Sequence, residues 1–433
     1  MIRHTVQWFL LLGGLACAAP AIPTATKLEP GDPEANGFSV ARLARLDSAL
    51  NQWVESGDIP GAVGLIARNG RIVYYRAAGY NDVAARTPLA SDGIFRIASQ
   101  TKAITSVAVM MLWEEGKFLL DDPVLKYIPA FKEQKAIEKD SRGEETLVPA
   151  KRAVTVRDLL THTAGIAYPL GAVRGYYEKE GLTAASTFGA GYPGMKLSDV
   201  IPRLAAAPLS HQPGDQWTYG YSVDVLGYLV EIWSGMTLDE FFRRRIFEPL
   251  GMQDTYFNVP SEKAGRLVNF FRADSAGNLT QQTVLRFPYG SDTLALSYPL
   301  EAKTYFGGGG GLSSTVMDYA VFLQMLLNGG EYNGARLLSP NTVRMMTVNQ
   351  IGDLVIDKVG TKFGLGFSVA SDASFGHRPA PPGTFAWGGA LGTTYWVDPG
   401  RKIIALLYRQ MWGGDRAGVG ERFPTLVYQA LTE

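Results

Sequence analysis

The feature that most constrains the fold is a run from Ser99 to Glu115 that repeats at helical spacing and is apolar on almost every side. Its apolar members follow one another closely: Ala103, Ile104, Val107, Ala108, Val109, Met110, Met111, Leu112 and Trp113. A helix that is apolar all round must be covered by other elements. We therefore predict a fold assembled around one buried helix, and a chain of 433 residues is long enough to enclose it.

β-rich segments stand towards both ends of the chain, with helical patterns between them. Residues 62–68 and 71–77 are joined by Asn69-Gly70, which accepts positive φ and predicts a hairpin. Further β-like runs are 367–370, 394–397 and 403–407. Helices are expected at 40–54 after a Ser39 cap, 156–160 after Thr155, 223–234, 238–246, 316–327 after Ser313, and 423–431. This order predicts an α/β (α+β) fold, in which helices flank one mainly antiparallel sheet and a mainly helical region is inserted.

Charge excludes several classes of partner. Lys+Arg 41 and Asp+Glu 41 leave no net charge, so neither a nucleic-acid backbone nor an anionic membrane surface is favoured. The densest charge cluster, Lys132 to Arg152, mixes both signs, which is typical of a solvated surface. We expect a small-molecule substrate, and the sequence leaves the oligomeric state open.

The N-terminus resembles a secretory signal peptide. A basic start precedes an apolar run, and Ala19-Pro20-Ala21 forms an A-x-A-like cleavage site. We predict a signal peptide over residues 1–21, a linker over 22–37, and a secreted or periplasmic protein with no membrane attachment after cleavage. A lipid anchor at Cys17 is the alternative. Cys17 is the sole cysteine, so cleavage would leave no disulfide or thiol nucleophile.

The strongest chemical motif is Ser99-Gln100-Thr101-Lys102, at the start of the buried helix. Positions i and i+3 share one helical face, so Lys102 would lie beside Ser99. A buried amine must either lose its charge or find partners. A neutral Lys102 could take the Ser99 proton, whereas a charged one could stabilise an alkoxide.

Two further elements could complete a site. Tyr219, in Trp217-Thr218-Tyr219, precedes a helix and is a candidate general base if it projects into a cleft. The run Trp387-Gly388-Gly389 lies on a predicted strand whose edge a substrate could approach closely. A packing aromatic and a β-bulge are the alternative interpretations. His162, His211 and His377 are scattered, so we predict structural roles for them and no metal site.

Taken in order, these motifs resemble the serine β-lactamase and penicillin-binding-protein superfamily, on its class C side. Within it the chain is most similar to the β-lactamase-like carboxylesterases (family VIII). Additional landmarks support the resemblance: Phe95-Arg96-Ile97-Ala98, Leu119 to Val124, Leu159 to Gly165, Gly311 to Thr315. It covers about residues 38–430 and implies a catalytic domain over 38–433, with sheet regions at about 38–100 and 300–433 and a helical region at about 101–299.

The resemblance also implies roles. Ser99 matches the nucleophile that forms an acyl-enzyme, Lys102 the lysine that activates it, and Tyr219 the base. The backbone N–H groups of Ser99 and Ala390 match an oxyanion hole, and no cofactor is implied. Tyr221 is a rival base or a substrate contact.

Two departures from the family pattern concern the substrate. Tyr219-Gly220-Tyr221 lacks the Asn usual two residues after the tyrosine, and Trp387-Gly388-Gly389 lacks a cation for a substrate carboxylate. Both losses favour neutral esters, with Trp387 as an apolar wall beside Gly388 and Gly389. We predict a carboxylesterase for short-chain acyl esters. The alternatives are a β-lactamase or D,D-peptidase, an acyltransferase or amidohydrolase with the same three residues, and a binding module without catalysis.

Overall fold

The computed structural model describes residues 27–432, apart from 184, 186–187, 189–191, 193, 275, 288–292 and 413–416. The predicted signal peptide and Cys17 lie outside the described residues. Part of the predicted linker is described, and there the chain already joins the main sheet at Glu29.

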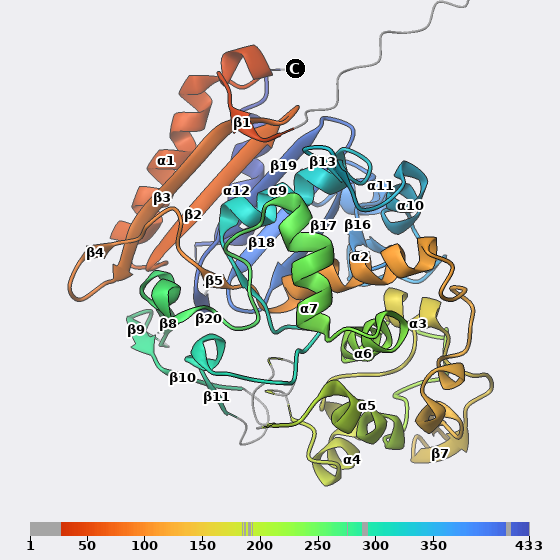
Figure 1. Ribbon diagram of the computed structural model, residues 1–433. Helices are drawn as coiled ribbons and strands as arrows, with labels where there is room; N and C mark the ends of the chain where they lie inside the picture. The colour runs from red at the N-terminus through yellow and green to blue at the C-terminus, as the bar shows by residue number, and fades with distance from the viewer. Residues whose placement is uncertain are drawn as a thin grey trace, which may run out of the picture.

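One large sheet brings distant parts of the chain together (Figure 1). Its strands are β1 (Glu29–Pro30), β2 (Gly61–Arg68), β3 (Arg71–Asp82), β4 (Thr87–Pro88), β15 (Lys362–Phe363), β16 (Ser368–Val369), β17 (Phe385–Gly389), β18 (Thr393–Asp398) and β19 (Ile403–Tyr408). The strand order is β1-β3-β2-β19-β18-β17-β16-β15, with β4 on β3, and only β1 pairs in parallel. The pairing of β2 with β19 places Leu65 opposite Leu406. The predicted hairpin is confirmed, and Asn69 and Gly70 both have positive φ (53° and 75°).

Helices cover both faces of this sheet, because its central strands β2 and β19 carry buried apolar side chains on both faces. On one face, α1 (Val40–Glu55) and α12 (Val419–Gln429) pack on the side chains of Ile66 and Ala405. On the other, α9 (Val316–Leu327) and α2 (Thr101–Glu114) pack on Leu65 and Leu406.

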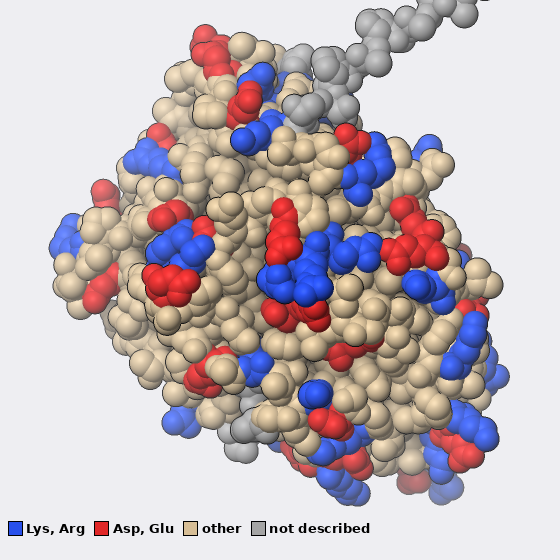
Figure 2. All heavy atoms as spheres, in the orientation of Figure 1, with Lys and Arg blue, Asp and Glu red and all other residues tan. Residues whose placement is uncertain are grey.

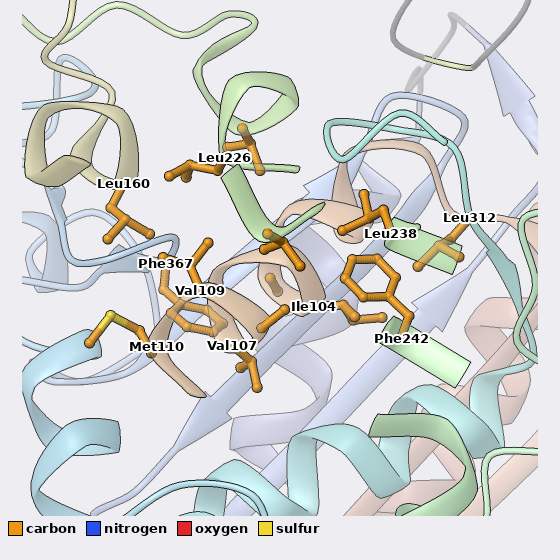
Figure 3. Packing of buried hydrophobic residues seen from close by; sticks show 14 of the residues in the cluster. Ile104, Val107, Val109, Met110, Leu160, Leu226, Leu238, Phe242, Leu312 and Phe367 are labelled. Atoms are coloured by element: carbon orange, nitrogen blue, oxygen red, sulfur yellow. The ribbon is translucent and has the colours of Figure 1, made fainter. Parts of the chain in front are cut away.

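α2 is the buried helix that the sequence predicts. Every residue from Thr101 to Leu112 is buried. It packs against α6 (Ser222–Ser234) and α7 (Leu238–Phe242), and α6 in turn packs against α3 (Val156–Thr161) and α5 (Leu197–Ala206). Figure 3 shows Ile104 of α2 close to Leu238 and Phe242. The site described below lies at the N-terminal end of this helix.

The inserted region also contains strands. The charged cluster forms a hairpin of β6 (Lys135–Lys139) and β7 (Glu145–Pro149), whose largely exposed residues need little apolar cover. Two small sheets follow: β8 (Phe270–Ala273) with β9 (Leu279–Gln282) and β20 (Met411–Trp412), and β10 (Val284–Arg286) with β11 (Thr293–Ala295). The remaining α-helices are α4 (Arg174–Lys179), α8 (Glu248–Leu250), α10 (Pro340–Met346) and α11 (Asp372–Phe375).

One local prediction is wrong, and another is confirmed with a change of helix type. Ser313 does not cap α9, because Ser313 and Ser314 form β12 and pair with β5 (Phe95–Arg96). Thr315 caps the helix instead and its hydroxyl accepts from the N–H of Asp318 at 3.1 Å. The helix predicted over 238–246 changes character at Arg243, where α7 gives way to a π-helical turn.

The surface has no dominant sign of charge on the face seen in Figure 2, where acidic and basic side chains are interspersed. Within the described ranges, none of the helices combines the length and the apolar character needed to cross a membrane.

Candidate active site

Ser99 lies where a short 3-10 turn, Ala98–Gln100, leads into α2. Ala98 is buried and has a φ of 45°, a conformation that residues other than glycine rarely adopt. Such strain persists only where the surroundings enforce it, and it is concentrated at functional sites. The hydroxyl of Tyr319 donates to the Gln100 carbonyl (2.8 Å), and that of Tyr408 donates to the Gln100 side-chain oxygen (2.5 Å). These buried contacts fix the turn that presents Ser99.

The Ser99 side chain is accessible to a substrate. The residue is only partly buried, and within the described part of the chain its hydroxyl makes no hydrogen bond, to Lys102 or to any other group. A catalytic hydrogen bond that is loose in an empty site commonly tightens when substrate binds.

Lys102 is carried inside by α2 and is 2% exposed. Its Nζ donates to the Gly309 carbonyl (2.6 Å) and to the Tyr168 hydroxyl (3.0 Å), and it lies 4.7 Å from the centroid of the Tyr219 ring. Burial by itself lowers the pKa of Lys102, but Tyr168, Tyr219 and Asp224 outweigh it and raise this pKa above its usual value. Of the two sequence-based alternatives, the structure therefore supports the charged amine.

Tyr219 lies between Lys102 and Trp387. The indole N–H of Trp387, on β17, donates to the Tyr219 hydroxyl oxygen over 3.2 Å. The Tyr219 ring also packs on His162 (4.8 Å between centroids) and on Trp217 (5.9 Å). The predicted tyrosine thus reaches the predicted lysine, and its oxygen is oriented by a donor from the predicted strand.

Tyr168 is a site residue that sequence reasoning missed. Besides its hydrogen bond to Lys102, its ring packs edge-on against Tyr219, with centroids 5.6 Å apart. Burial raises the pKa of Tyr168 above its usual value, and the Lys102 ammonium only partly opposes this. It lies three residues after Gly165, the end of a motif singled out by resemblance, but nothing else distinguishes it among 20 tyrosines.

The end of β17 approaches the turn before Ser99 very closely. A Cβ on Gly389 would lie 2.3 Å from the Ile97 carbonyl oxygen, so only glycine fits there. β16 pairs with β17 only at Phe385 and Ala386, and Ala390 follows in an exposed turn. This arrangement brings the predicted oxyanion-hole segment next to the Ser99 turn, and the roles of Ser99 N–H and Ala390 N–H stay predictions.

Tyr221 points elsewhere. It is 3% exposed, its hydroxyl donates to the Thr183 carbonyl (2.5 Å), and its ring packs on Tyr168. This placement favours a supporting role over a substrate contact. His211 likewise supports the loop before Tyr219, through a 2.9 Å hydrogen bond between its Nε2 and Thr218.

Five glycines, Gly307–Gly311, run past the buried ends of α2 and α6. A Cβ on Gly308 would lie 2.6 Å from the Val223 carbonyl oxygen, so the segment requires small residues. Its carbonyls accept from Thr105 at Gly308 (2.8 Å) and from Lys102 at Gly309. The glycine run therefore serves the site by holding Lys102.

A groove of about 610 Å³ shares Trp217 and Trp387 with this site, but Ser99, Lys102 and Tyr219 do not line it. Trp217 and Trp387 form part of its wall, and sheet residues Ala386 and Gly388 and the α12 residue Tyr428 form another part. Its volume falls in the range of small-molecule sites, and Trp387 both lines the groove and donates to the Tyr219 hydroxyl.

Comparison with known proteins agrees with this geometry. The family model described as Beta-lactamase matches residues 46–422, and the chain belongs to that family. Together with the site, this defines a serine hydrolase of the β-lactamase fold.

Three similar proteins illustrate the range of the family. Esterase EstB of Burkholderia gladioli is 31% identical over 87% of this chain and 92% of its own length. A protein of Escherichia coli (strain K12) named as a candidate D-alanyl-D-alanine carboxypeptidase is 30% identical over 92% of this chain and 88% of its own. The solved structure of EstCE1, titled a hydrolase with promiscuous acyltransferase activity, has a TM-score of 0.75 and 27% identity, covering 91% of this chain and 100% of that one.

Proposed function

We propose that this protein is a carboxylesterase that cleaves short-chain acyl esters through an acyl-enzyme on Ser99. The observation that carries the proposal is the place of Trp387. On β17, this indole stands beside the Tyr219 hydroxyl at the position where the family usually has a cationic side chain or a histidine. An indole offers an apolar face and one N–H, which suits a neutral ester better than the carboxylate of a β-lactam or a peptide.

The first half of the reaction acylates the enzyme. The Ser99 oxygen attacks the ester carbonyl carbon while its proton passes to the deprotonated Tyr219 oxygen, whose negative charge the Lys102 ammonium balances. The oxyanion of the tetrahedral intermediate is expected to receive the N–H groups of Ser99 and Ala390. The C–O bond to the alcohol then breaks, and Tyr219 returns the proton to the departing oxygen.

The second half reverses these roles. Water gives a proton to Tyr219 and attacks the acyl carbon, and the proton returns to the Ser99 oxygen as the carboxylic acid leaves. An alcohol in place of water would give a new ester. The printed title of EstCE1 supports keeping acyl transfer as a second activity of the same site.

The deciding experiment compares two substrates. The protein and its Ser99→Ala variant are given p-nitrophenyl butyrate and a chromogenic cephalosporin, and kcat/KM is measured for each. We expect fast ester cleavage, slow cephalosporin cleavage, and loss of both in the variant. A faster reaction with the cephalosporin would instead favour the β-lactamase or peptidase alternative.

A third arm tests acyl transfer. Addition of a short alcohol to the ester assay, with product analysis by chromatography, separates hydrolysis from transfer. New ester formed in preference to free acid at low alcohol concentration would make the protein an acyltransferase.

A further inference from the structure

Gly309 forms hydrogen bonds both with Lys102 and with Asp224, a buried carboxylate on another helix. Asp224, in the first turn of α6, is 0% exposed, and its Oδ1 accepts from the Gly309 N–H at 3.2 Å. The carbonyl of the same Gly309 accepts from Lys102 Nζ at 2.6 Å. Because α2 and α6 pack against each other, the carboxylate and the ammonium face one peptide segment from two sides.

Both charges lie where water does not screen them. Moving an ammonium or a carboxylate out of water costs several kcal/mol unless an opposite charge and hydrogen bonds compensate it. Gly309 supplies one hydrogen bond to each group, and the attraction between the two charges acts in surroundings of low polarity. Asp224 raises the pKa of Lys102, in agreement with this geometry.

The other titratable groups around Lys102 are Tyr168, Tyr219 and His162. Burial raises the pKa of Tyr168, and burial together with the Lys102 charge lowers the pKa of His162 well below its usual value, so neither of these two residues carries a charge. Among the described residues, Asp224 is thus the carboxylate that acts on Lys102.

We propose that Asp224 is a positioning residue for the acyl-enzyme reaction: it fixes the Gly309 carbonyl against Lys102 and supplies the negative charge that retains Lys102 as an ammonium. The proposal rests on the proposed function only in that Lys102 must assist Ser99. It assigns Asp224 no contact with the substrate.

The direct test is Asp224→Asn, which keeps the shape and the acceptor for Gly309 but removes the charge. We expect kcat for p-nitrophenyl butyrate to fall about 10- to 100-fold, less than the about 10²- to 10⁴-fold effect of losing the acid–base group itself, with KM changed by less than about twofold. The alkaline limb of the kcat/KM profile should move to lower pH, because the ammonium is lost at lower pH. Asp224→Glu keeps the negative charge, so its alkaline limb should lie closer to that of the unmodified protein.

Asp318→Asn is the matched control. Asp318 occupies the corresponding first turn of the buried helix α9, where its carboxylate accepts from the Thr255 hydroxyl (2.9 Å) and from the N–H of Asp254 (2.7 Å). A general effect of removing a buried carboxylate would lower Tm in both variants, but only Asp224→Asn should move the alkaline limb. An Asp224→Asn enzyme with the kcat and alkaline limb of the unmodified protein would overturn the proposal.

A double-mutant cycle keeps the proposal testable if activity is too low to measure. Unfolding in urea is followed for Lys102→Met, Asp224→Asn and the double variant. Removing one charge leaves the other buried and unpaired. Each substitution should therefore destabilise the unmodified protein more than it destabilises the variant that already lacks the other charge. Additive effects would overturn the proposal. The cycle needs no substrate, so a failure of the esterase assignment would leave its result unaffected.

Discussion

The indole N–H of Trp387 donates to the hydroxyl oxygen of Tyr219 across 3.2 Å, so the strand that borders the site also orients its candidate base. A donor in this position stabilises negative charge on the tyrosine oxygen. Such a hydrogen bond to a charged group is worth about 1.5–3 kcal/mol. In the proposed reaction, this contact makes Trp387 part of the proton-transfer machinery as well as an apolar wall.

Replacing Trp387 by Phe should keep the wall and remove the donor. We expect kcat for p-nitrophenyl butyrate to fall about 10- to 100-fold with little change in KM, as the loss of that hydrogen bond predicts. Trp217→Phe is the matched control, because the buried Trp217 N–H has no partner within the described residues. Its kcat should fall less. Equal losses in the two variants would contradict the role of the Trp387 N–H.

The two tyrosines at Lys102 should differ in their contributions. Tyr219→Phe removes the oxygen that takes the Ser99 proton, and we expect kcat to fall about 10²- to 10⁴-fold. Tyr168→Phe removes only a hydrogen-bond acceptor of the Lys102 amine, and we expect a loss of about 10-fold. Stopped-flow measurement of p-nitrophenol release reports the acylation step for both. A larger loss in Tyr168→Phe would transfer the role of base to Tyr168.

The placement of Ser99 and Lys102 at the start of a buried helix could be predicted because their relationship is local, while their roles stay predictions. A spacing of three residues on a helix brings two side chains to one face whatever the rest of the chain does. The apolar residues that follow showed that this helix is buried. The same reasoning located the hairpin at Asn69-Gly70, where the turn chemistry is contained in two residues.

Tyr168 and Asp224 could not be predicted, because their approach to Lys102 depends on the fold. Tyr168 is 66 residues from Lys102 in sequence, and its hydroxyl is brought there by the loop after α3. Asp224 acts through Gly309, 85 residues further along the chain. The prediction that Ser313 caps α9 failed for a similar reason. Ser313 pairs with Arg96 of β5, a residue distant in sequence, and the helix begins only after that pairing ends.

The close approach of Gly389 to Ile97 gives a test of the predicted oxyanion hole. A Cβ at Gly389 would lie 2.3 Å from the Ile97 carbonyl, so Gly389→Ala must push β17 away from the Ser99 turn. We expect a destabilisation of about 1–3 kcal/mol and a loss of kcat of at least about 100-fold, comparable with the loss of an oxyanion donor.

The neighbouring glycine provides the control for that change. A Cβ at Gly388 would come no closer than 3.2 Å, to the Thr393 carbonyl oxygen, so Gly388→Ala should keep Tm within a few degrees and lose less activity. Urea unfolding and kcat are measured for both variants. A fully active Gly389→Ala enzyme would exclude this segment from the oxyanion hole.

His162 should make the stability of the protein depend on pH. Burial and the Lys102 charge depress its pKa in the folded state, whereas in the unfolded chain it returns to about 6.5. Below about pH 6.5 the unfolded state therefore binds a proton that the folded state refuses, and the free energy of unfolding falls by up to about 1.4 kcal/mol per pH unit. Above that pH both states are neutral and the contribution is constant.

Other groups titrate in the same range, so the test is a comparison. Burial raises the pKa of Asp318 to about 6, which stabilises the folded state as pH falls and opposes the effect of His162. His162→Asn leaves that contribution in place, and asparagine tolerates the positive φ of 58° at this position. Urea unfolding between pH 5 and 7.5 should give a variant curve that falls less steeply at low pH. Parallel curves for the two proteins would mean that His162 can accept a proton in the folded state, contrary to its buried place beside Lys102.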